Sequence, residues 1–72
     1  MRYAVVFEPS DTGWSAYVPD LPGLIVTGPA DLERMRAQVA SAIDFHLRGL
    51  REDGDAIPEP TTHVEEIEPH AA

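Results

Sequence analysis

The chain has 72 residues, no cysteine, and thirteen acidic residues against five basic ones, which gives a formal net charge of −8. This length fits one small domain and excludes two, and the lack of cysteine excludes disulfides and every cysteine-based zinc site. The strong negative charge argues against nucleic acids and anionic membranes as direct partners. A basic protein is the macromolecular partner that this charge favours.

The small size also bears on assembly and location. A chain of about 60 residues buries only about 60% of its unfolded surface, so we expect stabilisation by self-association, as a homodimer or homotetramer. The longest unbroken apolar run, Ala4–Phe7, is far shorter than a membrane span. The N-terminus also lacks the apolar stretch of a signal peptide. We therefore expect a cytoplasmic protein.

Charge divides the chain into two parts. Residues 1–58 contain nine acids and all five arginines, whereas residues 59–72 contain four glutamates and no arginine. The second part also contains prolines and few apolar residues, a composition that cannot form a core of its own. We predict a folded domain over residues 1–58. Residues 59–72 are predicted to be a flexible acidic tail, with at most one short edge strand around His63–Ile67.

The first elements of the domain follow from alternation of side-chain type. Tyr3, Val5 and Phe7 share one face of an extended segment, and residues 14–18 alternate in the same way. The five residues between them, 9–13, are typical of a turn. These patterns predict an antiparallel hairpin with a five-residue turn.

The rest of the domain is predicted to form a loop, a third strand and a helix. Pro19–Gly23 ends the second strand, because proline has no N–H for a strand ladder, and Leu24–Thr27 is β-branched and apolar. From Leu32 to Leu50 apolar residues recur at three- and four-residue steps, which predicts a helix. Asp31 is its expected N-cap, and Gly54 is expected to end it. The predicted fold class is α+β: a three-stranded antiparallel sheet with one helix packed on one face.

Two strand faces follow from this arrangement. Trp14, Ala16 and Val18 are predicted to meet the helix, so Tyr17 points outward, and Ala4 and Val6 are further candidates for the outer face. Exposed apolar residues on a sheet are typical of an association surface. Scattered exposed apolar residues are also normal in monomers, and that alternative stays open.

The residues offer little for catalysis. No serine lies in a nucleophile-elbow motif, and His46, His63 and His70 match no metal-binding spacing. Glu8, Asp11 and Asp20 are candidate Mg²⁺ ligands, but turn and loop roles explain the two aspartates better. We predict no catalytic residue, no metal and no cofactor.

Five residues are predicted to contact a protein partner, because they lie on strand edges or in the Pro19–Gly23 loop: Glu8, Trp14, Tyr17, Asp20 and Leu21. A loop with two prolines and a glycine either fixes the geometry of the fold or presents a contact point. The alternative, that Trp14 and Leu21 belong to the core, stays open.

Taken together, residues 2–60 resemble the HicB antitoxin family. The resemblance is carried by segments in a fixed order: Tyr3–Phe7, Gly13–Tyr17, the Pro-Asp-Leu-Pro-Gly loop, Thr27-Gly28, the Leu32–Leu50 helix and the segment after it, Glu52–Pro60. It implies a degenerate ribonuclease-H-like fold without catalytic acids, with a short strand after the helix. It also implies a non-catalytic antitoxin of a type II toxin–antitoxin pair, which binds and blocks a small basic mRNA-interferase toxin (HicA-like).

The chain departs from the family pattern in ways that leave alternatives open. Many members carry a C-terminal DNA-binding domain, and we expect this chain to be a short form without it that does not bind nucleic acid directly. Arg34 and Arg36 replace a more acidic first helical turn. The alternative function is an orphan oligomeric adaptor or small-ligand-binding module of the same fold without a toxin partner. A Mg²⁺-dependent enzyme is a distant third.

Overall fold

The alternating N-terminal segments form a tight hairpin. In the computed structural model, which describes residues 1–71, β1 (Val6–Ser10) pairs antiparallel with β2 (Gly13–Tyr17). Pro9 lies opposite Trp14 and Ser10 opposite Gly13, so the connection is only Asp11 and Thr12. The predicted five-residue turn is therefore wrong, because Pro9 and Ser10 continue the strand. Proline is accommodated there since β1 is at the edge of the sheet, where a missing N–H interrupts no inner ladder.

Gly13 is required by a close approach of two backbone segments. A Cβ atom at this position would lie 2.7 Å from the Cα atom of Pro29, closer than real Cβ atoms come to backbone. The hairpin turn and the connection into the helix therefore pack against each other at a residue without a side chain.

The third strand completes the predicted sheet. β3 (Ile25–Gly28) pairs antiparallel with β2, which gives the order β1-β2-β3. The intervening loop is closed by backbone hydrogen bonds: the Leu21 N–H donates to the Val18 carbonyl (3.0 Å), and the Leu24 N–H donates to the Leu21 carbonyl (3.1 Å). Gly23 takes a φ of 85°, a conformation that glycine adopts without strain.

The helical stripe forms α1 (Leu32–Glu52), as predicted. The Asp31 carboxylate accepts a hydrogen bond from the backbone N–H of Arg34 (2.8 Å), which satisfies one of the free donors of the first turn. At the other end Gly54 has a φ of 73°, and its N–H donates to the Arg51 carbonyl (3.1 Å). Both predicted ends of the helix are confirmed.

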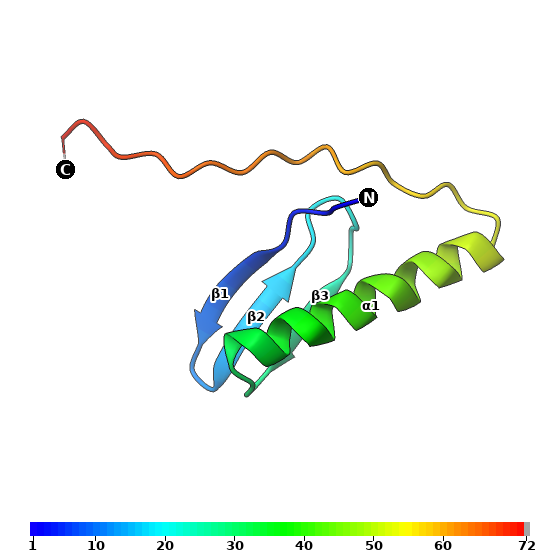
Figure 1. Ribbon diagram of the computed structural model, residues 1–72, viewed down its shortest axis with the longest axis horizontal. Coiled ribbons are helices and arrows are strands. Elements are labelled where there is room, and N and C mark those ends of the chain that lie inside the picture. The colour runs from blue at the N-terminus through cyan, green and yellow to red at the C-terminus, as the bar shows by residue number, and fades with distance from the viewer. Residues whose placement is uncertain (72) are drawn as a thin grey trace.

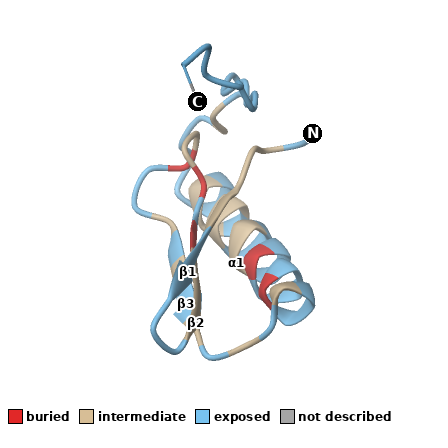
Figure 2. Cartoon of the chain, turned by 90° about the vertical axis from the view of Figure 1, so that its left-hand side faces the viewer, coloured by how far each residue is buried: buried red, intermediate tan, exposed pale blue. Residues whose placement is uncertain are grey.

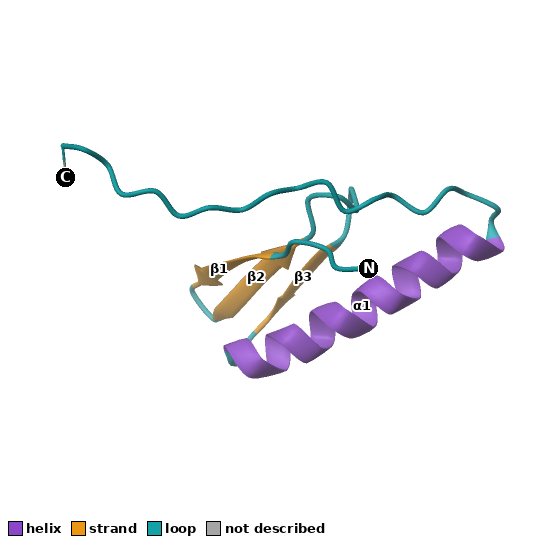
Figure 3. Cartoon of the chain, turned by 45° about the horizontal axis from the view of Figure 1, so that its top comes forward, coloured by secondary structure: helices purple, strands orange, loops and turns teal. Residues whose placement is uncertain are grey.

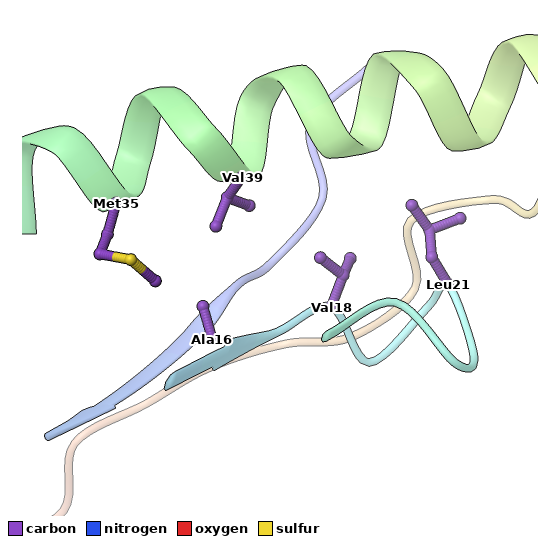
Figure 4. Close-up of a cluster of buried hydrophobic side chains, with 5 residues drawn as sticks. All are labelled: Ala16, Val18, Leu21, Met35 and Val39. Atoms are coloured by element: carbon purple, nitrogen blue, oxygen red, sulfur yellow. The ribbon is translucent and has the colours of Figure 1, made fainter. Parts of the chain in front are cut away.

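The core lies between the sheet and α1, which packs on one face only (Figures 1 and 2). Ala16 and Val18 point from the strand side toward Met35 and Val39 on the helix, and Leu21 reaches the same layer from the β2–β3 loop (Figure 4). These five side chains are buried, and Leu21 and Met35 are fully enclosed. Burying a side chain of their size stabilises the fold by about 1.5–3 kcal/mol.

The segment after α1 is extended. Residues 55–69 contain neither helix nor strand, and residues 61–71 are exposed. Figure 3 shows the chain leaving the helix and running past the end of the sheet as an open loop. The short strand expected around His63–Ile67 is thus not formed in this structure. Among residues 1–71, none of the helical structure combines the length and the apolar character that a membrane crossing requires.

Candidate protein-binding surface

The face of the sheet that α1 does not cover has an apolar row. The strand register places Val6, Tyr17 and Ile25 directly opposite one another across all three strands. Because Ala16 points into the core, its neighbour Tyr17 points to the other side. Tyr17 is 42% exposed and Ile25 is 66% exposed. We call Val6, Tyr17 and Ile25 the open-face row.

A second row on the same face is polar. Glu8, Ser15 and Thr27 are paired across the strands two residues along from the open-face row, and Glu8 and Thr27 are exposed. Residues two positions apart on a strand face the same side and lie about 7 Å apart, so the two rows are neighbours in one patch. An apolar centre beside an acid and two hydroxyls suits a protein partner. No enclosed pocket for a small molecule occurs among the described residues.

Asp20 connects the β2–β3 loop with the segment after the helix. One oxygen of its carboxylate accepts the backbone N–H groups of Thr61 (3.2 Å) and Thr62 (3.1 Å), and the other accepts their hydroxyl groups at 3.1 and 2.9 Å. We call this contact the Asp20 latch. The hydrogen bond from the Thr62 N–H is the largest cause of a lowered pKa at Asp20, and it outweighs partial desolvation, which acts in the opposite direction.

A second contact holds the same segment a few residues earlier. The hydroxyl of Tyr3 donates a hydrogen bond of 2.6 Å to the backbone carbonyl of Pro58 in a partly buried setting. Such a bond contributes about 0.5–1.5 kcal/mol. Together with the Asp20 latch it fixes the path of residues 58–62 across the end of the sheet, between the N-terminus and the β2–β3 loop.

The described residues contain no arrangement typical of a metal or catalytic centre. No three or more histidine, aspartate or glutamate side chains come together in residues 1–71. His63 pairs with Glu65 at 2.8 Å, and both side chains are largely in solvent. The oxygens of Asp20, one of the three candidate Mg²⁺ ligands, accept hydrogen bonds from two threonines instead.

The five predicted partner contacts occupy different environments. Glu8 and Tyr17 are exposed on the open face, whereas Trp14 is half-buried and packs against the core. Asp20 forms the latch, and Leu21 has no exposed surface, so the alternative assignment of Leu21 to the core is the one the structure shows. Glu8 and Tyr17 are exposed to a partner, Trp14 and Asp20 are exposed in part, and Leu21 is enclosed. The partner-contact role of all five stays a prediction.

The sequence-based prediction missed Ile25, Thr61 and Thr62. Ile25 was placed in a strand, but its position on the open face depends on the register with β2. The two threonines lie about forty positions from Asp20, and no local pattern connects them. The one signal in the sequence for such a contact is that the two threonines are adjacent hydroxyl residues directly after Pro60.

A family model described as "HicB_like antitoxin of bacterial toxin-antitoxin system" matches residues 3–71. The chain is 35% identical over 68 residues to Antitoxin HicB 2 of Photorhabdus laumondii. The matched region covers 90% of this chain and 46% of that protein. The chain is 34% identical over 58 residues to an uncharacterised 14.9 kDa protein from the rep-hol intergenic region of Haemophilus phage HP1, covering 81% of this chain and 43% of the phage protein.

The chain thus spans less than half the length of these curated relatives. No solved structure matches it significantly. The family model covers nearly every residue, including the sheet, the β2–β3 loop, the helix and the latched segment. This chain belongs to the HicB-like antitoxin family of bacterial toxin–antitoxin systems.

Proposed function

We propose that this chain is the antitoxin of a type II toxin–antitoxin pair and that it acts without catalysis, by binding and blocking a small basic mRNA-interferase toxin of the HicA-like kind. The observation that carries the proposal is the family match over residues 3–71. The net charge of −8 supports it, because a toxin that binds RNA presents a basic surface. Opposite charge speeds the encounter of two proteins and orients them.

The open face is the surface we propose for toxin contact. Tyr17 provides an exposed aromatic side chain at the centre of the patch, and Ile25 and Val6 flank it. Glu8 supplies a negative charge in the neighbouring row. Of the other predicted contacts, we propose that Trp14, Asp20 and Leu21 act by holding β2 and its loop in shape.

Co-expression with the protein encoded next to this chain tests the proposal. We expect a small basic protein to co-purify and its RNA cleavage to stop when this chain is added. Recovery of no such partner, or cleavage that continues at full rate in the complex, would contradict the proposed function.

A matched pair of variants tests the surface. Tyr17→Ala removes the central aromatic of the open face, and we expect the affinity for the toxin to fall at least tenfold, as for a buried tyrosine at an interface. Phe45→Ala is the control, because Phe45 is 75% exposed on α1. Equal losses in both variants would show that the open face is not the toxin site.

We also propose that the chain forms a homodimer or homotetramer and acts in the cytoplasm, where mRNA is cleaved. The small number of buried side chains supports self-association. Light scattering at micromolar concentration should give a mass of at least twice 7.9 kDa. A stable monomer would refute the oligomer, leaving toxin binding unaffected.

The finer fold assignment is a proposal as well. A β-β-β-α order with a strand-like segment after the helix is compatible with a degenerate ribonuclease-H-like fold. In that arrangement residues 1–58 form the domain, and residues around His63–Ile67, which are extended but unpaired in this chain alone, become a further strand when a sheet edge is supplied to them. An experimental structure of the toxin complex that leaves this segment outside any sheet would contradict the assignment.

A further inference from the structure

The segment beyond the Asp20 latch is extended and makes almost no contact with its own chain. In residues 63–68, which we call the arm, every residue is exposed, with Val64 64% and Ile67 82% exposed. Within residues 1–71, no backbone hydrogen bond to the main chain of the arm is formed. Both its peptide groups and its two apolar side chains are therefore available to another molecule.

The root of the arm is nevertheless held firmly. Tyr3 binds the carbonyl of Pro58, and Asp20 binds both Thr61 and Thr62 directly before the arm begins. Figure 1 shows the arm continuing from this point past the end of the sheet. A chain that is fixed at its root loses less conformational freedom on binding than a free tail would.

An extended segment with free peptide groups can bind by adding a strand to the exposed sheet edge of another protein. Main-chain hydrogen bonds then supply affinity, and alternate side chains supply specificity. In the arm, Ile67 falls on one side of such a strand and Val64 on the other. Each side would therefore place one apolar residue against the partner.

Charge decides which partner fits. The arm contains Glu65, Glu66 and Glu68, no lysine or arginine, and one histidine, His63, which pairs with Glu65. If two arms paired with each other, the same glutamates of both copies would lie close together, and like charges close to each other oppose pairing, so self-association is expected to use another surface. A basic protein has the complementary charge.

We propose that the arm binds the basic toxin as an added β-strand and that the Asp20 latch positions it to do so. This inference rests on the proposed function and assigns the toxin a second contact, separate from the open face. The arm supplies backbone pairing and charge, whereas the open face supplies apolar contact.

Neutralising the arm tests the charge contribution. The full chain carrying Glu65→Gln, Glu66→Gln and Glu68→Gln is compared with a control that carries the same charge change in the body, Asp44→Asn, Glu52→Gln and Asp55→Asn. The three control residues are exposed. We expect the affinity for the purified toxin to fall about tenfold or more in the arm variant at low salt and less than threefold in the control.

Hydrogen exchange tests the added strand. We expect the backbone amides of residues 63–68 to exchange quickly in the free chain and to slow at alternate positions in the toxin complex. Asp20→Asn should weaken toxin binding without abolishing it, and the circular dichroism of the helix should not change.

The outcomes separate this inference from the proposed function. If the unmodified chain binds no basic partner, the proposed function fails. If it binds the toxin while the arm stays unprotected and the arm variant binds as well as the control, the proposed function stands and the arm proposal is overturned. Protection of the arm by self-association in the absence of toxin would overturn it too, since a second copy would then be the occupant.

Discussion

Leu21 provides a direct test of whether the β2–β3 loop belongs to the core. Its side chain is fully enclosed, although it lies in a loop. Leu21→Ala removes three buried carbon atoms, which corresponds to about 2.4 kcal/mol of lost transfer free energy at 0.8 kcal/mol per methylene. Incomplete closure of the cavity adds to this, and the usual total for such a change is about 2–5 kcal/mol.

This loss is large for so small a protein. A chain of 72 residues has a total stability of about 4–11 kcal/mol. Since the site lies at the end of the core, where the loop can move inward, we expect a destabilisation of about 3 kcal/mol. The thermal midpoint should then fall by roughly 12–24 °C.

Urea unfolding followed by Trp14 fluorescence measures the effect. Ile25→Ala serves as the control, because Ile25 is 66% exposed and should change the free energy of unfolding by less than about 1 kcal/mol. If Leu21→Ala unfolds at the same urea concentration as the unmodified chain, the enclosed loop leucine contributes nothing to stability. The packing argument would then be refuted.

Three further substitutions or titrations have defined outcomes. Gly13→Ala should destabilise the chain by about 1–3 kcal/mol, because the new Cβ meets the backbone of Pro29, and a midpoint equal to that of the unmodified chain would contradict this. Asp31→Ala should cost about 0.5–2 kcal/mol in chemical unfolding through loss of the helix N-cap. The pKa of Asp20 is lowered by the Thr62 N–H, so its contribution to stability is complete above the ordinary value of 3.8 and is lost as pH falls through the lowered pKa. An NMR titration of the Asp20 carboxyl should therefore give a midpoint below 3.8, and Asp20→Asn should flatten the acid limb of the stability profile.

Local patterns predicted most of the fold. The helix was identified with both of its ends, because capping by Asp31 and termination at Gly54 depend on residues within one turn. The three strands were identified, but β1 begins and ends later than predicted and its turn is shorter. Pro9 was interpreted as a turn residue, and its place at a sheet edge depends on pairing that alternation alone does not specify.

The candidate surface was predictable only in part. Tyr17 was expected to face outward, and the structure confirms this, since alternation along one strand decides it once Ala16 faces the core. Leu21 was assigned to a partner-facing loop, with the core as the alternative. Its burial comes from the loop folding back under the helix, which depends on backbone hydrogen bonds among Val18, Leu21 and Leu24 and on packing against α1.

The sequence by itself determined that this is one small, acidic α+β chain with the motifs of its family, a body that contains all five arginines, and an acidic tail without arginine. Those properties are additive or local, because composition sets charge and short-range periodicity sets strands and helices. Only the tertiary structure decided that Asp20 binds Thr61 and Thr62, and that the acidic segment leaves the body from that latch. Residues about forty positions apart meet only after the sheet and helix have packed, so no pattern along the chain predicts their contact.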